Sequence, residues 1–190
     1  MNQKAENLLA LAVSHAHHLG LHRSKVVGGG MSAFFSEMWR RLWWCLYVLD
    51  RRLAIETGHP FLIHDINTDT PLPQDLNDDW MFRYQKGSSA EPDPAPLDEM
   101  IQASASPIPY LTAMVTYSKV LGKVWEGIYG ANMAEIPPSV PLCQHLEQML
   151  FLAEKNIRPE FTLRQSGALN TPQSQVPRWK VKQRMLMRAV

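Results

Sequence analysis

Residues 34–56 read FFSEMWRRLWWCLYVLDRRLAIE, the strongest helical pattern in the chain. Apolar side chains recur there every three or four positions, which predicts one long helix over residues 34–56. One face of this helix comprises Phe35, Met38, Leu42, Cys45, Leu46, Leu49 and Leu53. Much of the remaining surface is also apolar, with Trp43, Trp44, Tyr47 and Val48. A helix that is apolar nearly all round is buried between other elements, so we expect this helix to be enclosed by its neighbours.

The flanking sequence predicts further helices and no strands. Ser32 or Ser36 can cap the start of the long helix, and Gly58 with Pro60 ends it. Helical spacing also predicts elements over residues 7–19, 110–129 and 140–156, with another pattern beginning at residue 180. No convincing strand alternation occurs. The predicted fold class is therefore all-α, an irregular multi-helix array around a central buried helix, with long proline-rich loops.

Three segments between these helices are expected to be non-helical. Residues 26–30, which include three consecutive glycines, favour an exposed linker. Prolines punctuate residues 60–107, and within them the weakly hydrophobic run 87–98 is expected to form a loop excursion. Residues 58–73 are expected to cross the long helix antiparallel or oblique to it, as a clamp. Ile63 and Leu72 are the predicted core contacts of this clamp.

Charge and cysteine content exclude several classes of protein. Lys and Arg number 19 and Asp and Glu number 18, a net charge of +1, whereas phosphate-binding domains are strongly basic. No apolar run approaches the roughly 20 residues of a membrane span. Cys45 and Cys143 are far apart within helical patterns, which favours free thiols in a reducing compartment. We therefore expect a soluble chain with no direct contact to nucleic acid or membrane.

Asp65, Asn67 and Asp69 have the spacing of the first ligands of a calcium loop. The loop should continue with Gly and Glu, but the corresponding positions hold Thr70 and Leu76. These carboxylates are expected to cap turns and helix starts instead.

Histidines cluster over residues 15–22, but zinc needs further ligands, and neither an HExxH motif nor a cysteine partner accompanies them. The glycines at 28–30 follow no strand and precede no Gly-Lys-Ser/Thr, so they do not form a phosphate loop. Spacing assembles no nucleophile, base and orienting group. We therefore expect no metal site, no cofactor site and no catalytic residue in this chain, and hence no enzyme.

One set of motifs resembles a known family. The set comprises LGLHR at 19–23, EMWRRLWWCLYVLDR at 37–51, GHP at 58–60, Ile63, Asp65 and Leu72-Pro73. It is similar to the fungal-specific transcription factor domain, the regulatory middle region downstream of binuclear zinc-cluster modules. The branch typified by xylanolytic and nitrate-pathway activators is the most similar. The match is dense over residues 5–73, with His59 a departure because the family more often has Arg there. The structural motif residues it implies are Arg40, Arg41, Trp43, Trp44, Tyr47, Asp50, Arg51, Gly58, Pro60, Asp65, Leu72 and Pro73.

The resemblance implies that the chain is the regulatory domain of a nuclear transcription factor. Residues 183–188 are similar to the start of a later family helix, so residues 1–190 are expected to be one partial domain, truncated at both ends. The family's six-cysteine module is not among these residues, which leaves zinc and DNA binding to the full-length protein. The implied partners are that missing DNA-binding module, protein co-regulators or a small effector. A helical interaction scaffold unrelated to transcription is the alternative, and a small-molecule enzyme is the weakest hypothesis.

Two features of the long helix predict specific contacts. Arg40, Trp44, Tyr47 and Arg51 follow each other at spacings of four, three and four, so either guanidinium can lie on an aromatic face. This stripe is expected to lock the helix against its neighbours, and anchoring a partner helix or ligand is the sharper alternative. Asp50 has no cation three or four positions away and needs a partner if buried. We expect Arg23, His22 or the N-terminus of another helix to supply that partner.

Overall fold

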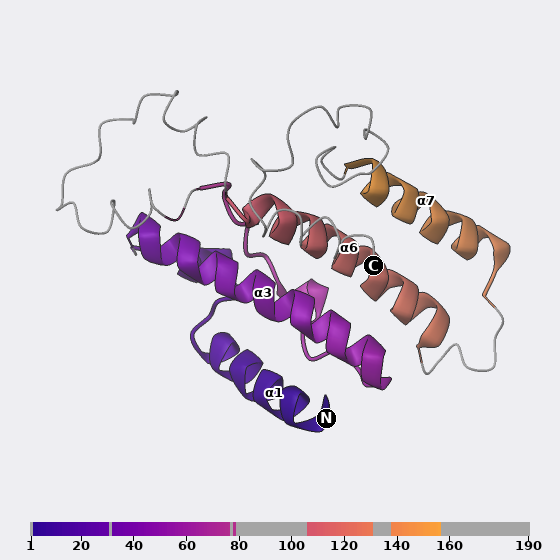
Figure 1. Ribbon diagram of the computed structural model, residues 1–190, viewed down its shortest axis with the longest axis horizontal. Coiled ribbons are helices and arrows are strands. Elements are labelled where there is room, and N and C mark those ends of the chain that lie inside the picture. The colour runs from indigo at the N-terminus through magenta and orange to yellow at the C-terminus, as the bar shows by residue number, and fades with distance from the viewer. Residues whose placement is uncertain (1, 31, 77, 79–105, 131–137, 157–190) are drawn as a thin grey trace, which may run out of the picture. The chain divides into compact units, whose positions relative to one another are not determined.

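The structure is a computed structural model that describes residues 2–30, 32–76, 78, 106–130 and 138–156. All regular elements within these ranges are helices, which confirms the predicted all-α class (Figure 1). In chain order they are α1 (Asn2–His18), α2 (Ser24–Val27), α3 (Ala33–Thr57), the short 3-10 helix η1 (Asp65–Asn67), α6 (Ile108–Tyr129) and α7 (Val140–Asn156). None of the described helices is both long and apolar enough to cross a membrane. The loop excursion predicted at 87–98 and the helical pattern from 180 lie outside the described residues.

The chain divides into two compact units, residues 1–125 and residues 126–190. The first unit contains α1, α2, α3, η1 and most of α6, and it holds the core. The second contains the last turn of α6 together with α7. Whether the whole chain is one partial domain, as predicted, stays a prediction.

Helix α1 begins at Asn2, earlier than predicted, and ends in a left-handed glycine. Gly20 has φ +74°, and the N–H of Leu21 donates to the carbonyl of Ala16 at 3.0 Å, which satisfies the last turn. The buried face of α1 comprises Leu9, Val13 and Ala16. Leu8 and Leu19 lie near this face at helical spacing, but both are exposed.

The segment predicted as an exposed linker contains one helical turn, α2. Val27 at the end of that turn is fully buried, and its carbonyl accepts a hydrogen bond from the Ser36 hydroxyl at 2.6 Å. Val26 before it and the glycines that follow, residues 28–30, are exposed. The linker prediction therefore fails at Val27, because the flexibility of three glycines says nothing about the apolar valine before them.

Both ends of α3 match the sequence prediction. The Ser32 hydroxyl accepts from the N–H of Phe35 at 3.4 Å, as an N-cap does. At the other end Gly58 takes φ +76°, and its N–H donates to the carbonyl of Ala54 at 2.8 Å. The long helix is therefore confirmed, from Ala33 to Thr57.

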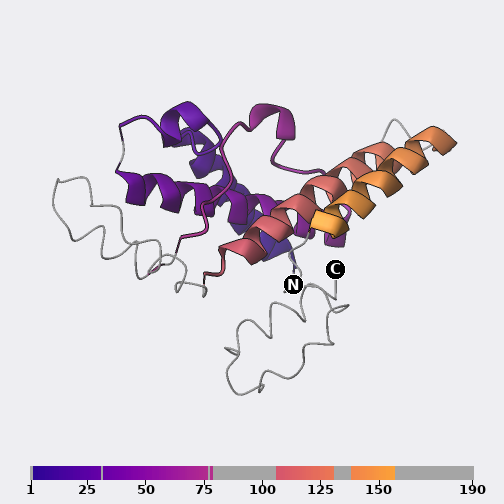
Figure 2. The ribbon, with the colours of Figure 1, turned by 90° about the horizontal axis from the view of Figure 1, so that it is seen from above.

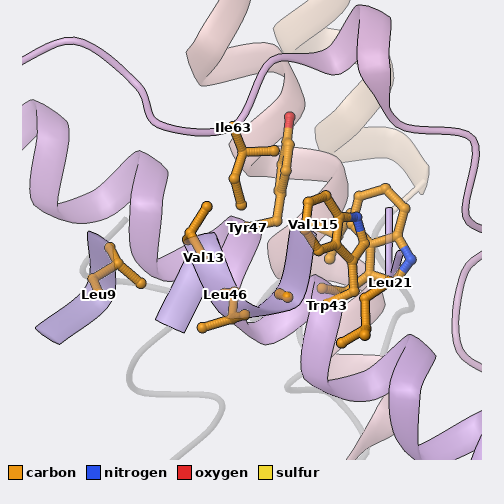
Figure 3. Packing of buried hydrophobic residues seen from close by; sticks show 10 residues of the cluster. Leu9, Val13, Leu21, Trp43, Leu46, Tyr47, Ile63 and Val115 are labelled. Atoms are coloured by element: carbon orange, nitrogen blue, oxygen red, sulfur yellow. The ribbon is translucent and has the colours of Figure 1, made fainter. Parts of the chain in front are cut away.

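The buried face of α3 is not the one predicted. In the core, α3 contributes Trp43, Trp44, Leu46 and Tyr47. These side chains pack against α1, against Leu21 and Ile63, and against Val115 of α6 (Figure 3). Of the predicted face, only Leu46 is buried, whereas Phe35, Met38, Leu42, Cys45 and Leu49 are exposed. The expectation that α3 is enclosed on all sides was therefore wrong. Sequence spacing identifies the apolar faces of a helix, but it cannot decide against which of two such faces the neighbouring elements pack.

Residues 58–76, named here the clamp, run antiparallel to α3, which is one of the two directions predicted for residues 58–73 (Figures 1 and 2). Clamp residues near position 63 contact Asp50 and Arg51 near the end of α3, and residues near 75 contact Glu37 and Arg41 near its start. Ile63 is fully buried, which confirms one predicted core contact.

Leu72, the other predicted core contact of the clamp, is exposed. Thr70 and Pro73 are buried instead. The Thr70 hydroxyl donates to the carbonyl of Leu21, and this contact sets which side chains of the clamp face inward.

Helices α6 and α7 start close to where the sequence places them. α6 begins at Ile108, two residues before the predicted start, and buries Val115, Ser118 and Gly122 in the first unit. α7 has the predicted bounds, and the Ser139 hydroxyl accepts from the N–H of Leu142 at 3.4 Å. Within the second unit Leu146 and Ala153 are buried on α7.

Candidate functional site

Arg51 is the centre of a polar cluster between α3 and the clamp, and only 1% of its side chain is exposed. Nη1 donates to Oδ2 of Asp50 at 2.7 Å and to the carbonyl of Ile63 at 2.9 Å. Nη2 donates to Oδ1 of Asp65 at 3.0 Å. The Tyr47 hydroxyl donates to the same Asp65 oxygen at 2.7 Å. One guanidinium thereby joins two turns of α3 to the clamp.

Aromatic rings cover both faces of this guanidinium. Its carbon lies 4.3 Å from the ring centre of Tyr47 and 4.1 Å from that of Phe61. Such cation–π contacts strengthen when water is excluded. From α6, Gly122 closes the remaining side, because a Cβ atom at this position would lie 3.0 Å from Nε of Arg51. Glycine at 122 thus permits the close approach of α6.

Asp50 is buried, as predicted, but its partners are not the predicted ones. Its carboxylate accepts from the N–H groups of Leu62 at 2.9 Å and Ile63 at 3.1 Å, and from Arg51. Arg23 pairs with Asp69 instead, at 3.6 Å. The prediction failed because only residues three and four positions from Asp50, Arg23, His22 and the N-terminus of another helix were considered as partners. The adjacent Arg51 and the main chain of the clamp were not considered.

Burial changes the acid–base behaviour of the cluster. It raises the pKa of Asp50, because loss of water outweighs the two backbone N–H donors and the neighbouring guanidinium. The pKa of Tyr47 is also raised, first by burial and then by its hydrogen bond to Asp65. Tyr47 therefore stays a neutral donor at physiological pH.

A second polar contact fixes the far end of the clamp. Glu37, which is buried, accepts from the N–H of Gln74 at 3.0 Å and from Arg41 at 3.2 Å. Arg41 also donates to the carbonyl of Leu76 at 2.8 Å and pairs with Asp78. The start of α3 is thus tied to the end of the clamp.

Trp44 lies between these two contacts and completes the row. Its indole N–H donates to the carbonyl of Pro71 at 2.9 Å, and its ring meets that of Tyr47 edge to face at 5.2 Å. Lys119 of α6 places its ammonium 4.7 Å from the indole centre. Of the predicted stripe, Arg51 does lie on an aromatic face, whereas Arg40 lies 3.5 Å from Glu37.

Trp43 lies one turn before Tyr47 on α3, in a cluster with two histidines. The ring centres of His17 and His22 are 5.0 Å apart and lie 5.4 Å and 5.9 Å from Trp43. Burial lowers the pKa of His22, and the charges of His17 and Arg23 lower it further. A neutral, aromatic packing role fits His22. No group of three or more metal-binding side chains occurs among the residues described.

A cavity of about 410 Å³ lies between α1, the end of α3 and the start of the clamp. At its rim Glu6 contacts Nδ1 of His59 at 2.8 Å. The Thr57 hydroxyl and His59 lower the pKa of Glu6. Asp50 reaches the wall, but both of its oxygens are already engaged. The other lining residues are Gln3, Asn7, Leu9, Ala10, Leu53, Ala54, Pro60 and Leu62.

The structure brings most of the predicted motif residues into one unit. Gly58 and Pro60 turn the chain into the clamp, and Pro73 is buried near its end. Sequence reasoning missed Glu37, Phe61 and Gly122 as members of the site. Glu37 precedes Arg40 and Arg41 at helical spacing, a signal that was available. For Phe61 and Gly122 the contacts depend on long-range packing and left no local signal.

These features define an all-helical domain in which one long helix is clamped by the segment that follows it. The sequence profile of the fungal specific transcription factor domain matches residues 2–175, and the chain belongs to this family. No solved structure matches the chain.

Several curated relatives carry names that agree with this assignment. The Zn(2)-C6 fungal-type transcription factor of Monascus ruber is 29% identical over 75% of this chain and 16% of its own length. The fusarisetin A cluster transcription factor of a Fusarium species is 28% identical over 88% of this chain and 20% of its own length. Pyrimidine pathway regulatory protein 1 of Saccharomyces cerevisiae is 40% identical over 33% of this chain and 7% of its own length. The resemblance seen in the motifs is confirmed, and the role of the chain is in the regulation of transcription.

The chain spans much less than two thirds of these relatives. In four curated relatives, two of them the Monascus and Fusarium factors above, the shared stretch is between 14% and 22% of the relative's length. Statements about a whole factor are therefore proposals.

Proposed function

We propose that this chain is the non-catalytic regulatory domain of a nuclear zinc-cluster transcription factor. DNA contact and zinc binding belong, on this proposal, to parts of the factor outside these residues. The net charge of +1 supports this division, because a phosphate-binding surface would need a basic excess. The name of the Monascus relative, a Zn(2)-C6 factor, supports the expectation of zinc elsewhere in the protein.

The observation that carries the proposal is the buried ion-pair cluster around Arg51. Burying a charge pair is costly, and apolar residues of similar size often stabilise a protein as well or better. Such a cluster is therefore better explained by conformational specificity, the selection of one arrangement of the chain, than by a gain in stability. Here it holds the clamp in one register on α3, because Arg51 and Asp50 bind the main chain at Leu62 and Ile63.

A clamp held in one register allows the domain to transmit a signal. A partner that pulls on the clamp must move α3 with it, because contacts join the two at both ends. We infer that the partner is the DNA-binding module of the same factor, a co-regulator or a small effector. Binding would change the position of α3 relative to the rest of the factor, and transcriptional output would change accordingly.

The polar cluster also supports a non-catalytic role. A general base needs a free lone pair within reach of a substrate. Both oxygens of Asp50 accept hydrogen bonds from the protein, and Asp65 accepts from Arg51 and Tyr47. These groups are engaged in holding the clamp.

The proposal is tested in the full-length factor with a pair of adjacent arginines. Arg51→Met removes the buried cation, whereas Arg52→Met removes an exposed one that pairs only with Glu56 among the described contacts. We expect Arg51→Met to change transcript levels of the target genes while chromatin occupancy per molecule of factor is kept. Arg52→Met should keep occupancy and change transcript levels less than Arg51→Met does, because the ion pair of Arg52 to Glu56 is exposed. Tyr47→Phe, which removes only the hydrogen bond to Asp65, gives a milder variant for the case that Arg51→Met is degraded.

Two results would reject the proposal. One is loss of chromatin occupancy in Arg51→Met or Tyr47→Phe at equal protein level, which would assign DNA contact to this domain. The other is a complete reading frame without six closely spaced cysteines upstream of residue 1, which would favour a scaffold unrelated to zinc-cluster factors.

A further inference from the structure

Helix α3 carries an exposed apolar stripe on the side away from the clamp. The stripe consists of Phe35, Met38, Leu42, Cys45 and Leu49, and exposed fractions are 50%, 40%, 50% and 47% for Phe35, Met38, Leu42 and Leu49. Cys45 is exposed too. The spacings of three, four, three and four are those of the a and d positions of a coiled coil. The stripe therefore has the pattern of a helix–helix seam.

This stripe is continuous with the core rather than scattered over the surface. Leu46, which is buried, lies four positions after Leu42 and three before Leu49, so it joins the stripe to the contact with α1. Isolated exposed leucines need no explanation, but a contiguous row marks an interaction surface.

We propose that the stripe binds the same stripe of a second copy of this chain, with the two α3 helices antiparallel. The ends of the stripe support this occupant. Its first residue is the aromatic Phe35, and the next a/d position after Leu49 is Arg52, whose side chain is 70% exposed. An antiparallel pair places Leu42 opposite Cys45 of the second copy, and Phe35 opposite Arg52 of the second copy.

In the antiparallel arrangement, Arg52 of each copy lies opposite the Phe35 ring of the other copy, so each end of the seam has one cation–π pair. A parallel arrangement would place the two Arg52 side chains opposite each other, where like charges repel. It would also align the two helix dipoles unfavourably, whereas the antiparallel pair opposes them. The charge pattern of one chain is thus complementary to itself only in the antiparallel sense.

The size of the stripe indicates a weak, reversible dimer. The five side chains expose less than about 500 Å² on each copy, because Phe35 is the only aromatic among them and aromatic side chains have roughly 200 Å². The total is therefore below about 1,000 Å², in the range of weak, transient interfaces. A dissociation constant in the micromolar range is expected.

The stripe is tested by sedimentation of the 190-residue chain across micromolar concentrations. We expect the wild type to pass from monomer to dimer, and Leu42→Asp to stay monomeric with an unchanged unfolding midpoint. Ile66→Asp is the matched control, because Ile66 is 93% exposed on the clamp and outside the stripe. It should dimerise like the wild type.

Cross-linking tests the orientation. In a Cys45→Ser, Cys143→Ser background, a chain with Phe35→Cys is mixed with a chain with Arg52→Cys. A short bifunctional maleimide should link these two chains to each other and neither chain to itself.

A wild type that stays monomeric would overturn the proposal, and would mean that the stripe is covered from within the chain or by another partner. A dimer that survives Leu42→Asp, or Arg52→Cys chains linked to each other, would overturn it as well. None of these outcomes bears on the role in transcription, because the inference rests only on α3.

Discussion

Replacing Arg51 by methionine isolates the energetic role of the buried cation. Methionine keeps an unbranched apolar stem between the rings of Tyr47 and Phe61, so little packing is lost. The guanidinium is lost, which leaves the Asp50 carboxylate buried with its two backbone donors alone and the carbonyl of Ile63 without its donor. Breaking a buried pair on one side costs about 3–5 kcal/mol.

The expected loss for Arg51→Met is about 3 kcal/mol, at the lower end of that range, because Asp50 can take up a proton. Because the pKa of Asp50 is raised, its carboxylate takes up a proton more readily than an ordinary aspartate does. The matched variant Arg52→Met breaks an exposed ion pair to Glu56 and should cost less than about 1 kcal/mol.

Urea unfolding, followed by helical circular dichroism and tryptophan fluorescence, measures both free energies of unfolding. The double variant Asp50→Asn, Arg51→Met completes a thermodynamic cycle. Its cost should be well below the sum of the single costs, because no uncompensated charge remains. Equal effects of Arg51→Met and Arg52→Met, or strict additivity in the cycle, would refute the assignment of Arg51 as the centre of the clamp.

Three further perturbations test other contacts. Gly122→Ala places a Cβ atom 3.0 Å from Nε of Arg51 and should lower the unfolding midpoint, whereas Gly127→Ala on the same helix meets only ordinary 3.7 Å contacts and should leave it equal or higher. Equal midpoints would contradict the close approach of α6. Gly58→Ala puts alanine at φ +76° and should cost about 1 kcal/mol by chemical denaturation, with Gly58→Asn costing less; no loss would mean that this turn relaxes. The lowered pKa of His22 means that the unfolded chain binds its proton first, so stability should fall as pH drops through 6.5, the ordinary pKa of histidine. Thermal melts between neutral and mildly acidic pH should show this, and His22→Gln should reduce the dependence; an unchanged slope would argue against a half-buried, neutral His22.

The sequence predicted those parts of the fold that local chemistry determines. Ser32 and Gly58 cap α3 as expected, because a cap needs only its own neighbours in the chain. Gly58 and Pro60 predicted that the chain turns back over the helix it has just left, but they left open whether it runs antiparallel or oblique to it.

The sequence did not predict what long-range packing decides. Both faces of α3 are apolar, and the clamp and α6 pack on the one that also carries Asp50, which was expected to be buried, and Arg51, whose charge is typical of a solvent-exposed position in a hydropathy pattern. Their burial depends on main-chain groups of the clamp, and backbone donors have no signature in the sequence. Leu72 was misplaced for a related reason, since the inward register of the clamp is set by Thr70 and its bond to Leu21.

The contacts that hold the clamp are mostly to its peptide groups and not to its side chains. Leu62, Ile63, Pro71, Gln74 and Leu76 each offer an N–H or a carbonyl to α3. Almost any amino acid could supply those groups, so many substitutions between positions 59 and 76 should be harmless. Inserting or deleting a single residue there would shift every later peptide group out of reach of its partner. We therefore expect the clamp to tolerate many substitutions better than it tolerates a change of its length.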